Sequence, residues 1–103
     1  MGMGKALKQI QKMQADMKKM QAELGSIRIS ATAGGGMVEA VVDGNRRIVE
    51  IKIAPEVVDP EDIETLQDLL QAAVNEATRK AEEYLAEEMQ KITGGLQLPP
   101  GLF

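Results

Sequence analysis

The sequence predicts a single α+β domain in which two long helices flank a three-stranded antiparallel meander. Apolar residues recur about every 3.5 residues near the start of the chain and about every 3.6 residues near its end, which predicts the two helices. Between them, apolar and polar residues alternate and glycines interrupt the pattern, which predicts the strands. A chain of 103 residues has the usual size of one domain, so residues 1–103 are assigned to a single one.

Residues 1–25 are predicted to form a basic helix that ends at Gly25. Its apolar stripe has the spacing of a coiled-coil seam. The stripe consists of Met3, Leu7, Ile10, Met13, Met17, Met20 and Leu24. This spacing places all five lysines of the helix away from the stripe, namely Lys5, Lys8, Lys12, Lys18 and Lys19.

Residues 26–54 are predicted to form the sheet, with strands in 27–33, 37–42 and 47–53. The glycines at 34–36 and the sequence Asp-Gly-Asn at 43–45 predict the two connections. In the last strand, we expect Val49, Ile51 and Ile53 to face the core. Some apolar side chains remain on the opposite face, where they are either covered by a partner chain or simply exposed.

Residues 59–93 are predicted to form the second helix, with Asp59 as N-cap and Pro60 in the first turn. Its stripe narrows to Ala73, Ala77 and Ala81, where we expect another helix to approach closely. Glycines at 94 and 95 end the helix. Residues 94–103 then form an apolar tail that we expect to dock on the protein or to contact a partner.

The composition argues against catalysis. The chain has no histidine and no cysteine, so the commonest general base, the commonest metal ligand and the thiol nucleophile are missing. We therefore expect no enzyme, no cofactor, no metal and no small-molecule substrate. No run of about 18 apolar residues is present, so we expect no membrane partner. The lack of cysteine fits a cytoplasmic protein.

The two long helices leave little material for a core in one copy of the chain. Tyr84 and Phe103 are the only aromatic residues, although aromatic side chains usually dominate burial. Association of several copies is the easier way to bury both apolar stripes, so we expect an oligomer.

The net charge of −4 averages over two ends of opposite sign. Residues 1–25 carry five lysines against two acids, whereas residues 56–103 carry three basic residues against eleven acids. A polyanion responds to charge within about 10 Å, so it responds to the basic end rather than to the average. A row of lysines along a rod suits a phosphate backbone, although lysines on a helix also serve solubility alone.

The chain as a whole resembles the YbaB/EbfC family of nucleoid-associated DNA-binding proteins. The order and spacing of several segments carry the resemblance, although no single segment is unique. These are KQIQKMQ at 8–14, GGMV at 35–38, DGN at 43–45, IKIAPE at 51–56, LQDLLQAAVNEA at 66–77, TGGL at 93–96 and PGLF at 100–103.

The resemblance implies a tweezer-like homodimer that binds double-stranded DNA with little or broad sequence preference and alters its conformation in the nucleoid. It also implies that the first helix and the carboxy-terminal part of the second form the arms. On this chain, the DNA-binding residues would be the five lysines of the first helix, with Arg79, Lys80 and Lys91 as weaker candidates. The second arm departs from this picture because it is strongly acidic, so the first helix is the better candidate.

Two alternatives remain open at this point. Two long helices joined by strands also resemble a prefoldin-like holding chaperone, since methionines at helix ends adapt to many clients. The apolar tail would alternatively suit a protein-partner adaptor.

Overall fold

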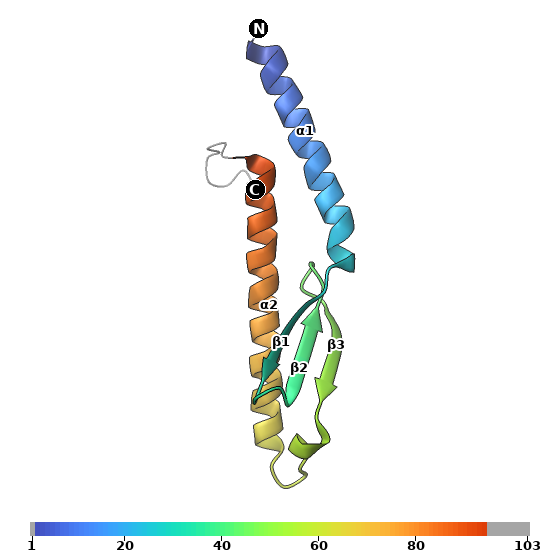
Figure 1. The fold of residues 1–103 in the computed structure, drawn as a ribbon, viewed down its shortest axis with the longest axis vertical. Helices are drawn as coiled ribbons and strands as arrows, with labels where there is room; N and C mark the ends of the chain where they lie inside the picture. The colour runs from blue at the N-terminus through green and yellow to red at the C-terminus, as the bar shows by residue number, and fades with distance from the viewer. Residues whose placement is uncertain (1, 95–103) are drawn as a thin grey trace.

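The elements follow the predicted order along an elongated molecule of 71 × 24 × 18 Å, shown in Figure 1. The computed structural model describes residues 2–94. The α-helices are α1 (Gly2–Glu23) and α2 (Ile63–Thr93), and the strands are β1 (Ile29–Ala33), β2 (Val38–Val42) and β3 (Ile48–Ile53). Two short 3-10 turns, η1 (Leu24–Ser26) and η2 (Pro55–Val57), connect them. The predicted α+β class and element order are therefore confirmed.

The three strands form one antiparallel sheet in the order β1-β2-β3. All three glycines between β1 and β2 have positive φ values, a backbone conformation that residues other than glycine rarely adopt. The pairing of β2 with β3 contains an irregularity, because Val41 lies opposite Glu50 while Val42 lies opposite Ile48. Val49 is therefore the extra residue of a β-bulge.

The core lies between α2 and the first two strands. Ala73, Ala77 and Ala81 are fully buried on α2, and they face buried Val38 and other residues of β1 and β2. Small side chains let the helix axis approach the sheet closely. The expected close approach to the alanine stripe is thus confirmed, but the element that packs there is the sheet and not another helix.

Strand β3 lies at the edge of the sheet, beyond the cover of α2. Val49, Ile51 and Ile53 were expected to face the core, but none of the three is buried in this single chain. Ile51 lies opposite Ala40 and Ile53 opposite Val38, so both share the face that packs on α2. They nevertheless remain 42% and 39% exposed, and Ile48 remains 52% exposed. The helix is narrow and covers only β1 and β2.

Helix α1 runs antiparallel to α2, and its amino-terminal end extends beyond the end of α2 (Figure 1). The predicted apolar stripe is covered only toward its carboxy-terminal end. Leu24 is buried, whereas Met3 is 88% exposed and Leu7 is 55% exposed. Gly25 does not terminate the helix in a left-handed conformation; it lies inside η1, after the α-helix has ended at Glu23.

Helix α2 begins three residues later than predicted, with its N-cap at position 62 and not 59. Its N-cap is Asp62, whose Oδ1 accepts from the Thr65 N–H at 3.3 Å and whose Oδ2 accepts from the Thr65 hydroxyl at 2.6 Å. Asp59 instead accepts from the Glu61 N–H in the preceding turn. At the other end, Gly94 adopts φ 58° and donates to the Gln90 carbonyl, which confirms the predicted stop.

The apolar tail lies outside the described residues from position 95 onward, so its predicted docking stays a prediction. Within residues 2–94, neither helix combines the length and the hydropathy needed to cross a membrane.

Candidate nucleic-acid interface

The five predicted lysines of α1 are all exposed. With 3.6 residues per turn, Lys5, Lys8, Lys12 and Lys19 fall on one flank of the helix, whereas Lys18 lies on another side. From Lys5 to Lys19 the row extends about 21 Å along the axis. Within residues 2–94, none of the five forms an ion pair with a carboxylate. Their charges are therefore available to an anionic partner.

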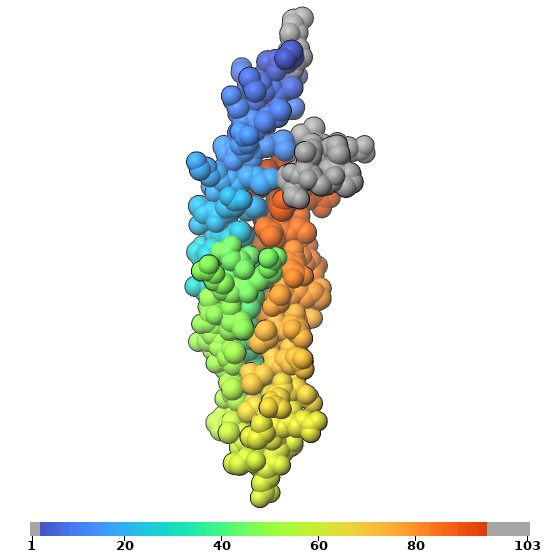
Figure 2. All heavy atoms as spheres, turned by 180° about the vertical axis from the view of Figure 1, so that it is seen from behind, coloured from blue at the N-terminus to red at the C-terminus, as the bar shows by residue number. Residues whose placement is uncertain are grey.

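The amino-terminal end of α1 stands clear of the other elements. Figures 1 and 2 show from opposite sides that this end extends past α2. The hollow next to the last turn of α2 is lined on the α1 side by residues from Gln9 to Asp16. Lys5 and Lys8 therefore lie on the projecting part of the helix, where a rod-shaped ligand can reach them from several directions.

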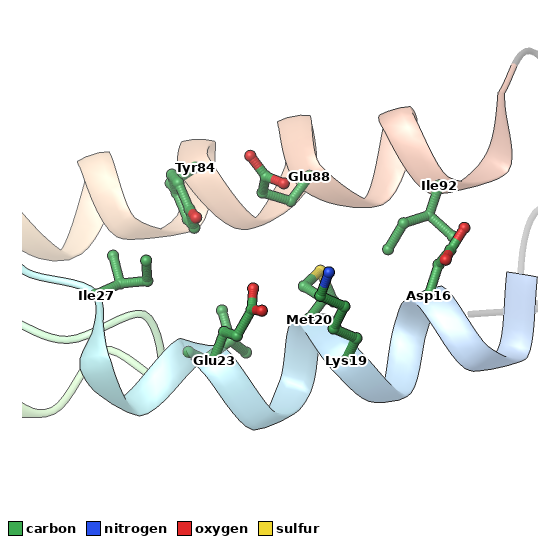
Figure 3. A pocket seen from close by; sticks show the side chains of 9 residues that line it. Asp16, Lys19, Met20, Glu23, Ile27, Tyr84, Glu88 and Ile92 are labelled. Carbon is green, nitrogen blue, oxygen red and sulfur yellow. The ribbon is translucent and has the colours of Figure 1, made fainter.

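The lysines closer to the sheet have more neighbours than the sequence indicated. Lys19 lines a hollow of about 190 Å³ between the helices, together with Asp16, Glu23 and Glu88. Figure 3 shows the Glu23 carboxylate pointing toward α2, with Glu88 projecting from α2 into the same gap. The expectation that every lysine faces away from the packed side is therefore wrong for Lys19, and also for Lys12, which lines the next hollow against α2. The charge of Lys19 acts in a partly acidic environment.

The hollow nearer the end of α2 brings two predicted residues together. Lys12 of α1 and Lys91 of α2 both line it, and Asp16 belongs to the same lining. At this level, each helix contributes one basic residue to the hollow.

The basic residues of α2 already have partners. Arg79 donates to Glu76 at 2.7 Å and to Glu83 at 2.9 Å, while Lys91 lies 3.1 Å from Glu88. The hydrogen bond from Arg79 holds the pKa of the Glu76 carboxyl below its ordinary value, and Glu76 in turn raises the pKa of Arg79. The hydrogen bond to Glu88 likewise raises the pKa of Lys91.

Lys80 uses its ammonium group differently, since its Nζ donates to the carbonyl of Ser30 at 3.0 Å. This bond ties α2 to β1. All three predicted basic residues of α2 are thus engaged, in contrast to those of α1.

Two further basic residues, Arg46 and Arg47, were not among the predicted DNA-binding residues. The structure places both, exposed, in the turn between β2 and β3, next to the carboxy-terminal end of α1. No motif marks these two residues, and their position beside α1 depends on tertiary contacts.

Together, the elongated α+β fold and the unpaired lysines of α1 define a class of protein that presents a positively charged rod to a polyanion. The model of the YbaB/EbfC DNA-binding family matches residues 1–96, so the chain belongs to that family. This membership supports DNA binding over the chaperone and adaptor alternatives.

Relatives of high similarity carry a consistent name. The chain is 59% identical over 97 residues to a nucleoid-associated protein of Thermoanaerobacter pseudethanolicus, covering 94% of this chain and 86% of that protein. It is 52% identical over 101 residues to a nucleoid-associated protein of Pelotomaculum thermopropionicum, covering 98% and 95%. The fold also matches the crystal structure of an uncharacterized protein of Helicobacter pylori, with a TM-score of 0.72 and 22% identity over 82% of this chain and 89% of that one.

Proposed function

We propose that the protein binds the phosphate backbone of double-stranded DNA through the lysines of α1, and that it does so as a homodimer in the nucleoid. The observation that carries the proposal is the contrast between the helices. The α1 lysines are exposed and form no ion pair within residues 2–94, whereas Arg79 and Lys91 are bound to carboxylates of α2. The protein acts by binding DNA and not by catalysis.

The mechanism is electrostatic. Each ammonium group that contacts a phosphate releases condensed counterions from the duplex. The flexible lysine side chain contacts the charged phosphates and not the edges of the bases. Such contacts agree with little or broad sequence preference. The three basic residues of α2 contribute more weakly, because a phosphate must compete with the carboxylates that they already contact.

The exposed apolar row of β3 supports a homodimer. Ile48, Ile51 and Ile53 lie on an edge strand whose outer backbone groups have no neighbouring strand within the described residues. Pairing of this edge with the same edge of a second copy buries the apolar side chains and completes the hydrogen bonds of the strand. Two copies of α1 would then project from one extended sheet as the arms of the expected tweezers.

The test is a salt titration of binding to a fluorescent 30-base-pair duplex of mixed sequence. If all five α1 lysines contact phosphates, the slope of log K against log salt is about −4.5 per protomer. Affinity then falls roughly 500-fold between about 50 and about 200 mM salt. Replacing all five lysines with glutamine should abolish most of this slope.

A position series sharpens the assignment. The double variant Lys5→Gln and Lys8→Gln should lose more affinity per replaced lysine than the single variant Lys19→Gln. The reason is that Lys19 shares its hollow with three carboxylates. Arg79→Gln should have a smaller effect than any of these. Unchanged binding by the five-lysine variant would refute the proposal.

A further inference from the structure

The turn between β2 and β3 is a rigid loop built around one buried carboxylate. Asp43 is only 6% exposed, and its Oδ1 accepts from the Asn45 N–H at 2.8 Å and from the Arg47 N–H at 3.0 Å. Its own N–H donates to the Arg47 carbonyl at 2.9 Å, and its carbonyl accepts from the Arg46 N–H at 3.0 Å. Oδ1 of the carboxylate thus binds two backbone N–H groups of the turn, and the two arginines are held in place by their main chain.

The same turn is fastened to the end of α1. The Gly44 N–H donates to the Leu24 carbonyl at 2.9 Å. The contact is so close that a Cβ at position 44 would lie 2.8 Å from the Leu24 carbonyl oxygen. Figure 1 shows the loop beside the carboxy-terminal end of α1. Arg46 and Arg47 thus keep a fixed position relative to the lysine row.

The backbone at Arg46 is unfavourable for an arginine. Its φ is 67°, and it is the only residue other than glycine with positive φ among residues 2–94. Glycine and asparagine adopt this conformation at lower cost. Strained residues of this kind are concentrated at functional sites, so an arginine here indicates a use for its side chain.

The side chains of Arg46 and Arg47 make no polar contact with the rest of the described chain. Neither guanidinium makes a hydrogen bond or an ion pair there, and both residues are exposed. Arg28 provides the contrast, because its Nη1 donates to the carbonyls of Gly25 at 2.8 Å and Ile27 at 2.9 Å. Arg28 supports the end of α1, whereas the turn offers two free guanidinium groups.

We infer that Arg46 and Arg47 form a second phosphate-binding site, which contacts the same DNA duplex as the lysines of α1. This inference rests on the proposed function. The guanidinium fork binds a phosphate by two parallel hydrogen bonds, so these contacts are more directional than those of lysine. A site fixed at the end of α1 extends the interface and holds the duplex at a defined position along the helix.

The test combines Arg46→Asn with Arg47→Gln in the full chain, using the same duplex and salt series. The slope of log K against log salt should lose about 0.9 for each arginine that contacts a phosphate. Arg46→Asn alone should also raise the melting temperature by roughly 4 °C, since asparagine relieves the strain at positive φ. Weaker binding by a more stable protein excludes misfolding as the cause.

Arg79→Gln is the matched control, because it removes the same charge where two carboxylates compensate it; it should change the slope far less. An unchanged slope in the Arg46 and Arg47 variant, with loss of binding in the five-lysine variant, would overturn this inference alone. Unchanged binding in the five-lysine variant would overturn the proposed function. Dissociation of the homodimer by the arginine variant, measured by light scattering, would assign the arginines to the subunit contact and overturn the inference.

Discussion

Replacing Gly44 with alanine should destabilise the protein strongly although it adds only one methyl group. The new Cβ would lie 2.8 Å from both the carbonyl oxygen and the Cδ2 atom of Leu24, and 3.1 Å from its Cα. Backbone atoms cannot rotate away as a side chain can, so the turn must separate from the end of α1. The hydrogen bond from the Gly44 N–H to the Leu24 carbonyl is then lost.

The size of the effect follows from two contributions. Overpacking in a close contact costs about 1–3 kcal/mol, and loss of the hydrogen bond costs about 1 kcal/mol. The carbonyl keeps a second donor, the Ile27 N–H at 3.2 Å, so no penalty for an unpaired buried group is added. The total of roughly 2–4 kcal/mol corresponds to a fall in melting temperature of roughly 10–25 °C for a domain of this size.

The assay is thermal unfolding followed by far-UV circular dichroism at fixed protein concentration, since stability of an oligomer depends on concentration. Gly25→Ala is the matched control: this glycine adjoins Leu24, but a Cβ there would meet nothing within 4 Å. In the Gly44→Ala variant, the backbone amide at position 44 should exchange its hydrogen faster than in the wild type. A melting temperature within about 3 °C of the wild type would refute the assigned close contact.

Three further changes test other parts of the structure. Ile51→Lys on β3 should convert the homodimer to monomers in light scattering, whereas Gln71→Lys on the exposed face of α2 should not; a dimeric Ile51→Lys protein would contradict the β3 interface. Ala77→Leu should cost about 1–3 kcal/mol in urea unfolding because no space remains between α2 and the sheet, and an unchanged midpoint would contradict that packing. The lowered pKa of Glu76 means that its stabilising contribution is complete at neutral pH and is lost as the pH falls below the ordinary value of 4.5 through the folded-state pKa. Glu76→Gln should therefore lose less stability than the wild type between about pH 6 and about pH 3, and equal losses would show that the pair with Arg79 contributes nothing.

The order of the helices and strands could be predicted from the sequence, because the two helical periods and the alternation in the strands are all strong. The start of α2 could not be placed, since Asp59 and Asp62 both have the chemistry of an N-cap. The two hydrogen bonds from Thr65 select Asp62, while the carboxylate of Asp59 serves the preceding turn. Thr65, three residues after Asp62, was the signal that favours the later start.

The exposure of β3 could not be predicted from alternation alone. A period of two shows which residues share a face, but not how many strands a helix covers. The bulge at Val49 also moves Ile48 onto the face of Val42, although simple alternation places it on the opposite face. The exposure of β3 depends on where α2 lies across the sheet, and the bulge depends on how β3 pairs with β2.

The ion pairs of α2 could have been predicted from the sequence. Glu76, Arg79 and Glu83 are spaced by three and four residues, which brings their side chains together on one helix face. The conformation of the Asp43 turn was harder to predict. Asp43, Gly44 and Asn45 are all residue types that tolerate positive φ, but the positive φ occurs at Arg46. The turn is also fixed by the hydrogen bond between Gly44 and Leu24, which joins residues 20 positions apart and cannot be read from local sequence.

The acidity of α2 is compatible with DNA binding because of where the carboxylates lie. Glu76, Glu83 and Glu88 each contact a basic residue of the same helix, which reduces the field that they exert on a nearby phosphate. The projecting part of α1 carries Lys5 and Lys8 beyond the end of α2, and charges separated by more than about 10 Å interact weakly at physiological salt. On the proposed interface, a duplex would be attracted to α1 and repelled from the uncompensated acids of α2. This combination of attraction and repulsion would orient the duplex, whereas a row of lysines alone would not.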